Sequence, residues 1–265
     1  MTAVYGWLTQ RPVAHRGLHD LRTGVAENSV SAARAAARKG FAIECDVRLS
    51  GDGEPMVFHD DDLGRLTDAR GPFSARTAIA LGRLPLTGAS DAIPTLRAFL
   101  EAAGDAPVMV EIKSAFDGDR TLARRVAAMA RAHGAPIALK SFDPGVMADL
   151  RDSAAAGPGV PLGMIAQARF DDEQWSAVPP RRRAGLAALA DYAAVRPDFL
   201  SWKVDDLPHA APTLFRAALG APVLAWTVRT PAQRARARRF ADQIIFEGAA
   251  LADDAAIVQG EGISE

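Results

Sequence analysis

The strongest constraint on the fold is a repeated alternation of short apolar runs with longer segments rich in alanine and arginine. The apolar runs have the length of strands, and the segments between them have helical character. Such alternation requires crossover connections, which make the strands parallel and place the helices outside the sheet. The expected strands are residues 12–15, 41–47, 55–59, 107–113, 136–142, 160–166, 198–203, 222–228 and 242–247. The pattern therefore predicts an α/β fold.

This set holds one strand more than an eightfold barrel needs. Residues 50–54, Ser-Gly-Asp-Gly-Glu, are typical of a turn, which would join strands 41–47 and 55–59 with no helix between them. We therefore expect a TIM (β/α)8 barrel distorted at this hairpin, with an open doubly wound sheet as the alternative. The long connection 60–106 is expected to be an insertion near the functional site that ends in a helix.

The helical segments carry recognisable ends. Pro144 and Pro231 are expected in first turns, where the missing amide hydrogen costs nothing. Gly40 and Gly134 are expected to close two helices in the left-handed conformation. The expected helices are residues 29–39, 96–103, 121–133, 144–156, 183–194, 209–219 and 231–240.

Composition limits the class of protein. A chain of 265 residues with 49% hydrophobic and 24% charged residues suits one globular domain, which we expect over 1–265. The net charge of −1 gives no general attraction to nucleic acid or anionic membranes. The arginine runs at 181–183 and 234–239 lack interleaved aromatic residues, so we interpret them as solvated helix surfaces. A single cysteine, Cys45, excludes an intrachain disulfide and a cysteine-rich zinc site.

We expect no secretory signal in the amino-terminal segment. Residues 1–8 contain neither a basic segment nor a long apolar run. A membrane-spanning helix would need about 20 apolar residues, which the chain does not offer. We therefore expect a cytoplasmic protein without integral membrane association. The sequence contains no signal for an oligomeric state.

Charged or ionisable side chains end four of the expected strands. Strand interiors normally exclude such groups, because burial of an unpaired charge costs several kcal/mol. The carboxyl ends of parallel barrel strands meet at one face, where active sites are built. We therefore expect these residues to form one site. The four segments are Val13-Ala14-His15-Arg16-Gly17, Ile43-Glu44-Cys45-Asp46-Val47, Met56-Val57-Phe58-His59-Asp60 and Val110-Glu111-Ile112-Lys113.

Three carboxylates in these segments are candidates for a metal site. Glu44 and Asp46 stand two apart on a strand, so their side chains leave the same face and repel unless a cation lies between them. Glu111 can complete the set, with Lys113 as a positive charge beside it. Oxygen ligands without histidine or cysteine favour Ca²⁺ or Mg²⁺ over zinc. The alternative is that these carboxylates form ion pairs with basic residues and hold no ligand.

Two histidines suit acid and base catalysis. His15 and His59 each close an expected strand, and a free histidine has a pKa of about 6.5. Near a carboxylate cluster, they suit a general base on one side of a phosphorus centre and a general acid on the other. Arg16 can hold a phosphate oxygen in its planar guanidinium.

The remaining histidines and two late tryptophans are weaker candidates. Trp226 can offer an apolar wall to a substrate, although core packing is the default for it and for Trp202. His19 lacks a strand context, His133 is expected at a helix end, and His209 is expected to start a surface helix. We leave these three histidines out of the predicted site.

The order of these motifs resembles the glycerophosphodiester phosphodiesterase family. No single motif would suffice, but the resemblance covers nearly the whole chain. The matching segments are Ala14-His15-Arg16-Gly17, Glu27-Asn28-Ser29, Glu44-Cys45-Asp46-Val47, Asp52-Gly53, His59-Asp60, Arg65-Leu66-Thr67, Ile93-Pro94-Thr95-Leu96, Glu111-Ile112-Lys113, Ser141-Phe142-Asp143 and Trp226-Thr227-Val228.

The resemblance implies a distorted TIM barrel of the phospholipase-C-like phosphodiesterase type. It implies hydrolysis of a small-molecule glycerophosphodiester to glycerol 3-phosphate and an alcohol. By position, His15 and His59 become the acid and base, and Arg16 and Lys113 meet the phosphate. The resemblance also makes three carboxylates the ligands of a divalent cation, Ca²⁺ or Mg²⁺, namely Glu44, Asp46 and Glu111.

The chain departs from the family pattern late in the sequence. Ser29 replaces the usual threonine, Arg229 stands where asparagine is common, and strand 242–247 ends in Phe-Glu rather than a Thr-Asp-like pair. These late loops bear on the choice of alcohol. Two other functions stay open: a lysophospholipase D-like phosphodiesterase, and a non-catalytic phosphodiester-binding protein.

Overall fold

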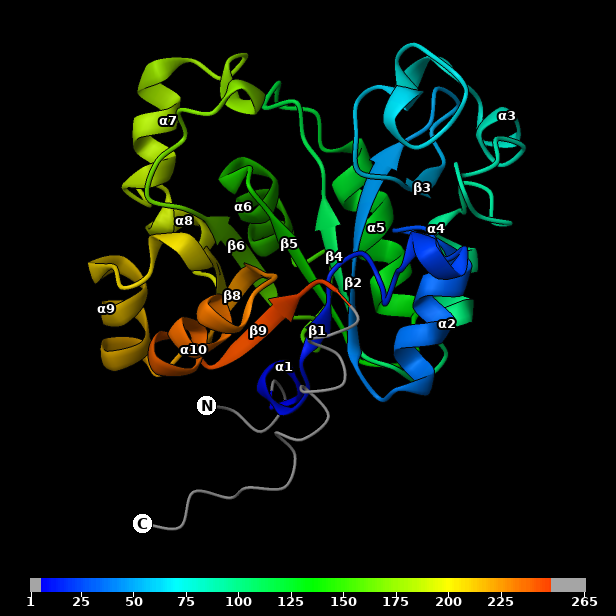
Figure 1. The fold of residues 1–265 in the computed structure, drawn as a ribbon. Coiled ribbons are helices and arrows are strands. Elements are labelled where there is room, and N and C mark those ends of the chain that lie inside the picture. The colour runs from blue at the N-terminus through cyan, green and yellow to red at the C-terminus, as the bar shows by residue number, and fades with distance from the viewer. Residues whose placement is uncertain (1–5, 249–265) are drawn as a thin grey trace.

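The computed structural model describes residues 6–248, and within them one nine-stranded sheet (Figure 1). Eight strands are parallel, and the sheet closes because β1 pairs with both β9 and β2. The ninth, β3, runs antiparallel to β2 and lies outside the ring. The strands are β1 (Val13–Ala14), β2 (Ala42–Leu49), β3 (Pro55–Val57), β4 (Val108–Ile112), β5 (Ile137–Ser141), β6 (Leu162–Ala166), β7 (Phe199–Lys203), β8 (Val223–Val228) and β9 (Gln243–Phe246). The predicted barrel with a hairpin distortion is confirmed, and the open doubly wound sheet is wrong.

Helices surround the barrel, as the alternation predicts (Figure 1). The α-helices are α1 (Trp7–Gln10), α2 (Val30–Arg38), α3 (Ala78–Leu81), α4 (Leu96–Ala103), α5 (Thr121–Ala132), α6 (Pro144–Ser153), α7 (Pro180–Ala187), α8 (Tyr192–Val195), α9 (Ala210–Leu219) and α10 (Pro231–Phe240). Short 3₁₀ turns are η2 (Leu21–Thr23), η3 (Leu63–Arg65), η4 (Phe73–Ala75), η5 (Glu173–Trp175) and η6 (Val204–Asp206).

Helix ends follow local chemistry. Ser29 caps α2 by accepting a hydrogen bond from the Ala32 amide, and Thr230 forms a capping box with Gln233 at α10. Pro144 and Pro231 occupy first turns, and Gly40 takes a left-handed φ of 75°, as predicted.

Two predictions about helices are wrong. The single helix over 183–194 is two helices, α7 and α8, because Leu189 takes a left-handed φ of 51° between them. After the turn, α8 carries Val195, which is fully buried. Gly134 is not left-handed, because α5 ends one residue earlier, where His133 leaves in extended backbone with a ψ of 131°.

The floor of the barrel interior is a layer of apolar side chains. One buried cluster contains Leu8 from α1 and a residue from each of seven parallel strands: Val13, Ala42, Met109, Ala138, Phe199, Leu224 and Ile245. The eighth strand contributes Gly163, whose lack of a side chain leaves room for the ring of its cross-strand neighbour Phe199. Alternate residues such as Ile43, Cys45 and Val47 pack outward in the cluster shared with the helices, as expected.

Adding one methyl group at Gly163 is expected to destabilise the barrel. A Cβ there would lie 2.3 Å from ring atoms of the fully buried Phe199. Overpacking of this kind costs about 1–3 kcal/mol, so Gly163→Ala is expected to lower the free energy of unfolding by about 2 kcal/mol in urea denaturation. Gly159→Ala is the matched control, because nothing lies within 4 Å of the position that its new methyl group would take, and its stability should not fall.

The next interior layer, two residues further along each strand, is mostly polar. Residues two apart on a strand point to the same face, so these side chains stand directly above the apolar floor. They are His15, Glu44, Glu111, Lys140, Ile165, Ser201, Trp226 and Glu247. The fold therefore places the ionisable groups at the carboxyl end of the barrel.

β3 and the segment after it lie beside this end of the barrel (Figure 1) and share a small core of their own. Met56, Phe58, Phe73 and Leu81 are buried in one cluster, and the two phenylalanine rings stack with centroids 5.1 Å apart. The helix expected to end this segment is α4, capped by Thr95. The cluster anchors the chain next to Asp60 and Asp61, which line the cavity described below.

No helix among residues 6–248 is long and apolar enough to cross a membrane. Residues 1–5, which form most of the segment interpreted above as lacking a secretory signal, lie outside the described residues.

Candidate active site

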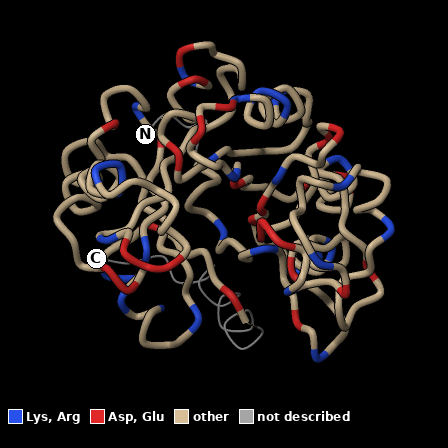
Figure 2. Tube along the Cα trace, turned by 90° about the horizontal axis from the view of Figure 1, so that it is seen from above, with Lys and Arg blue, Asp and Glu red and all other residues tan. Residues whose placement is uncertain are grey.

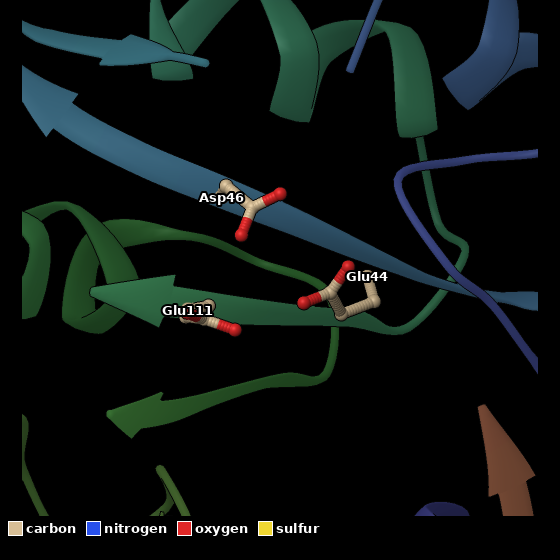
Figure 3. A group of neighbouring side chains, drawn as sticks. All are labelled: Glu44, Asp46 and Glu111. Carbon is tan, nitrogen blue, oxygen red and sulfur yellow. The ribbon is translucent and has the colours of Figure 1, made fainter. Parts of the chain in front are cut away.

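Three buried carboxyl groups meet above the barrel floor (Figure 3). Glu44 and Asp46 come from β2, and Glu111 comes from β4, where it pairs directly with Asp46 across the ladder. One oxygen of each carboxyl lies within 4.8 Å of the others. Exposure is 0% for Glu44, 1% for Asp46 and 6% for Glu111. The structure thus brings together the three carboxylates that the two-residue spacing predicts.

Three basic side chains face these carboxylates. Lys113 Nζ lies 2.7 Å from Asp46 Oδ1 and 2.5 Å from Glu111 Oε1. Arg16 Nε lies 3.1 Å from Asp46 Oδ2. Lys140, which was not among the predicted site residues, places its Nζ 3.0 Å from Glu44 Oε1. Lys140 could have been predicted from the sequence. A lysine inside the expected strand 136–142 is as unusual as the carboxylates inside the other expected strands.

Charge balance keeps two of the carboxyl groups ionised. Burial would raise the pKa of Asp46, but Lys113 and Arg16 outweigh burial and hold that pKa well below its usual value. Burial also acts to raise the pKa of Glu111, and Lys113 lowers it below the ordinary range. Because carboxyl groups must be deprotonated to bind a metal, both are prepared for that role near neutral pH.

The carboxylate trio fits a hard divalent cation. All three donors offer oxygen, as Ca²⁺ and Mg²⁺ require. Two oxygens bound to one Ca²⁺ at about 2.3–2.6 Å stand at most about 5 Å apart, which the trio satisfies. Glu44 Oε1 and Asp46 Oδ1 are buried without a hydrogen-bond donor among the described residues, although lysine ammonium groups lie within ion-pair distance.

Each candidate catalytic histidine is held by a carboxylate through Nδ1. His15 Nδ1 lies 3.1 Å from Glu247 Oε2, and His59 Nδ1 lies 2.6 Å from Asp60 Oδ1. An ionised carboxylate can only accept, so Nδ1 donates and Nε2 is left to exchange a proton. His15 Nε2 lies 4.0 Å from Glu44 Oε2, next to the carboxylate trio. Neither carboxylate was predicted from the sequence as a partner of a histidine.

The loop after β1 donates hydrogen bonds to the same carboxylates. Arg16 and Asn28 both take a left-handed φ of 56°. This conformation lets the Arg16 amide donate to Glu44 Oε2, while Asn28 Nδ2 donates to Asp46 Oδ2 at 2.9 Å. Gly17 is required here, because a Cβ would lie 2.7 Å from the Ala32 methyl group at a φ of 78°. The Arg16 guanidinium also binds Glu27 at 2.7 Å.

A cavity of about 710 Å³ opens above the trio. Acidic and basic positions lie side by side near the middle of the ring when it is seen from this end (Figure 2). Of the eight predicted site residues, six line the cavity: His15, Arg16, His59, Glu111, Lys113 and Trp226. Glu44 and Asp46 do not line it, and they lie buried among the ion pairs described above.

One wall of the cavity is aromatic. Trp226 donates from Nε1 to the Ser201 carbonyl at 2.8 Å, and its ring meets Phe142 edge-on with centroids 5.5 Å apart. Phe116 and Trp175 extend this wall. Trp202 is fully buried against His209, which agrees with core packing as its default.

The other histidines take mixed positions. His133 ends α5 and His209 caps α9, as expected for residues outside the site. His19 lies near the predicted site although it is not on a strand. Its Nε2 is 3.9 Å from Oε1 of Glu247, the carboxylate that also binds His15. Burial lowers the pKa of His19, against an opposing effect of Glu247.

Comparison with known proteins identifies the family of this chain. The model of the glycerophosphoryl diester phosphodiesterase family matches residues 15–246. Glycerophosphodiester phosphodiesterase 1 of Bos taurus is 41% identical over 61 residues, a stretch that covers 22% of this chain and 17% of that protein. The match therefore spans a small part of the length of this curated relative.

Solved structures share the fold over nearly the full chain. A phosphodiesterase of Oleispira antarctica, solved with its product sn-glycerol-3-phosphate, has a TM-score of 0.76 at 21% identity and covers 96% of this chain and 99% of its own. A putative glycerophosphoryl diester phosphodiesterase of Agrobacterium tumefaciens has a TM-score of 0.73 at 19% identity and covers 94% and 98%. Since the family model matches well over half of the residues, the chain belongs to the glycerophosphoryl diester phosphodiesterase family.

Proposed function

We propose that this protein hydrolyses glycerophosphodiesters to glycerol 3-phosphate and an alcohol, with a divalent cation and two histidines. The observation that carries the proposal is the convergence at one barrel end of three buried carboxylates and two carboxylate-held imidazoles. Family membership supports it, as does the glycerol 3-phosphate product bound by the Oleispira relative.

We assign the metal ligands to Glu44, Asp46 and Glu111, with Ca²⁺ or Mg²⁺ as the cation. When bound there, the cation would supply positive charge for a nonbridging phosphate oxygen and would acidify the glycerol 2-hydroxyl. The trio is suited to this because its donors are all oxygen and its members are buried together.

In the first proposed step, His15 acts as base and His59 as acid. His15 Nε2 takes the proton of the glycerol 2-hydroxyl as that oxygen attacks phosphorus, and the bond from phosphorus to the alcohol oxygen breaks. His59 Nε2 gives its proton to that oxygen. The order is supported by position: His15 lies beside Glu44, whereas the side chain of His59 is 30% exposed and can release the alcohol to solvent.

The second proposed step opens the cyclic glycerol phosphate. His59, now neutral, takes a proton from water as the water oxygen attacks phosphorus. His15, now protonated, returns a proton to the departing 2-oxygen, which restores both rings to their starting states. Glu247 and Asp60 hold the rings through Nδ1 in both steps.

Arg16, Lys113 and Trp226 are proposed to bind the substrate. Arg16 and Lys113 line the cavity and carry positive charge next to the trio, which suits a phosphate oxygen. Trp226 presents part of its ring to the same space and can pack against the glycerol carbons.

Product analysis tests the function. Purified protein is incubated with glycerophosphocholine, glycerophosphoethanolamine or lysophosphatidylcholine, with Ca²⁺, with Mg²⁺ and with excess chelator. We expect cation-dependent release of glycerol 3-phosphate, and a cyclic phosphate signal in ³¹P NMR at early times. Faster turnover of the lysophospholipid would favour the lysophospholipase D-like function, and binding without turnover would favour a non-catalytic role.

Glu247 is expected to stabilise the fold in a pH-dependent manner. The hydrogen bond from His15 lowers the pKa of Glu247 to about 2 against the effect of burial, and Arg229 adds to it. A carboxyl with a depressed pKa stabilises the folded state above its unfolded pKa and loses that contribution as pH falls toward the folded value. Glu247→Gln should therefore cost about 1 kcal/mol at neutral pH once solvent screening is allowed for.

Urea denaturation at several pH values measures this contribution. The stability difference between wild type and Glu247→Gln should fall by about half between pH ~7 and pH ~3.5, since much of the linkage is lost there. Glu101→Gln, at an exposed position on α4, is the control and should differ little at any pH. A Glu247 effect that is constant with pH would show that its charge is unimportant.

A further inference from the structure

Lys140 is a buried cation built into the carboxylate trio. It lies inside β5, directly across the ladder from Glu111. Its Nζ is 3.0 Å from Glu44 Oε1 and 4.0 Å from Glu111 Oε2. Its side chain is 3% exposed, so the ammonium has almost no contact with solvent. Two of the three proposed metal ligands therefore already have this positive charge beside them.

The two lysines of the site differ in their freedom to move. Lys113 follows the end of β4, its side chain is 14% exposed, and it can turn into the cavity toward a phosphate. Lys140 also lines the cavity, but it belongs to a strand bonded on both sides, to β4 and to β6, and its side chain is only 3% exposed. Lys113 is therefore freer to leave the carboxylates when a cation binds them, whereas Lys140 is held beside them by its strand and its ion pair with Glu44.

We propose that Lys140 is a resident counter-cation that weakens binding of the divalent cation while it holds Glu44 in position. This inference rests on the proposed function, since it concerns the same metal site. A fixed positive charge next to two ligands offsets part of their negative charge and repels the incoming cation. In a site screened from water, that repulsion is large.

Cation titration tests the proposal. Isothermal titration calorimetry with Ca²⁺, and separately with Mg²⁺, is run on wild type and Lys140→Gln without substrate. Glutamine removes the charge but keeps a donor for Glu44. We expect Lys140→Gln to bind the cation at least about tenfold more tightly. Equal affinity, weaker affinity, or no detectable binding by either protein would overturn the proposal.

Two further variants separate charge from shape and position. Lys140→Arg keeps the positive charge and should bind cations with affinity close to wild type; tighter binding by the arginine variant as well would overturn the charge argument. Lys203 lines the same cavity but pairs with Asp172 at 3.7 Å. Lys203→Gln should therefore leave cation affinity unchanged, and a comparable gain there would show a non-specific charge effect.

Thermal unfolding provides a second readout if a variant folds poorly. Removing Lys140 leaves the fully buried Glu44 carboxyl without this ion pair, so the cation-free protein should melt at a lower temperature. Added Ca²⁺ should then raise the melting temperature of Lys140→Gln more than that of wild type. A smaller rise would contradict the proposal.

Neither readout requires turnover. If no glycerophosphodiester is hydrolysed but Lys140→Gln binds Ca²⁺ more tightly, the proposed function fails and the inference about Lys140 stands. If hydrolysis is observed and the affinity does not change, the inference alone fails.

Discussion

Replacing His59 by glutamine is expected to lower kcat by about 10²–10⁴-fold, because the departing alcohol then lacks its proton donor. His15→Gln is expected to have an effect of the same size, since the attacking hydroxyl then lacks its base. Both rings line the cavity and are fixed by a carboxylate at Nδ1. The main loss should therefore appear in kcat, with a stability loss of only about 1 kcal/mol from the broken histidine–carboxylate bond. Steady-state kinetics with glycerophosphocholine, together with unfolding curves, measure both quantities.

The pH profile distinguishes the two roles. A base must be neutral and an acid protonated, so wild-type kcat/KM should be bell-shaped. His15→Gln should remove the acid limb, and His59→Gln should remove the alkaline limb. His133→Gln, at the end of α5, is the matched control and should keep full activity and both limbs. A bell-shaped pH profile that persisted in both His15→Gln and His59→Gln would rule out the acid and base assignment.

Replacing Asp46 by asparagine is expected to weaken binding of the divalent cation strongly. Even residues that only support a metal ligand change affinity by about 10–100-fold, so loss of a charged ligand should cost at least about 100-fold. Activity should then fall to the level seen with chelator. Calorimetric titration with Ca²⁺ and Mg²⁺, followed by kinetics at saturating cation, measures both effects.

The same substitution should also destabilise the protein, with a defined pH dependence. Asp46 neutralises Lys113 and Arg16, and breaking a buried ion pair costs about 3–5 kcal/mol. Because the pKa of Asp46 is depressed in the folded state, its contribution is present above the unfolded pKa of about 3.9 and is lost as pH falls below it.

Two variants complete the test of the carboxylate trio. Glu111→Gln provides a second ligand variant if Asp46→Asn folds poorly. Asp61→Asn provides the control, because Asp61 lines the cavity but its side chain is 92% exposed and outside the trio. Unchanged cation affinity in both ligand variants would rule out the metal site.

Sequence periodicity predicted the barrel and most of its site for one physical reason. Local backbone geometry fixes the direction in which each side chain of a strand points. Glu44 and Asp46 share a face because they stand two apart, and the alternation of strands and helices places that face at the carboxyl end of a barrel. The hairpin at 50–54 could also be predicted from local sequence, because two glycines in a short polar segment between strands are typical of a turn.

The helix over 183–194 was predicted wrongly because its ends depend on distant contacts. An alanine-rich segment favours helix throughout by local propensity. The chain breaks at Leu189, and Val195 beyond the break is buried in the core shared with distant strands and helices, contacts that local propensity does not include.

By itself, the sequence determined the order of the elements, the parallel direction of the strands, and the placement of three carboxylates and two histidines at strand ends. Only the tertiary structure decided which group neutralises which. Glu247 reaches His15 because β9 closes the ring against β1, and Lys140 reaches Glu44 because β4 separates β5 from β2 by a single strand. Spacing along one strand fixes the direction of a side chain, but ion pairs between strands depend on ring closure, which no local pattern encodes.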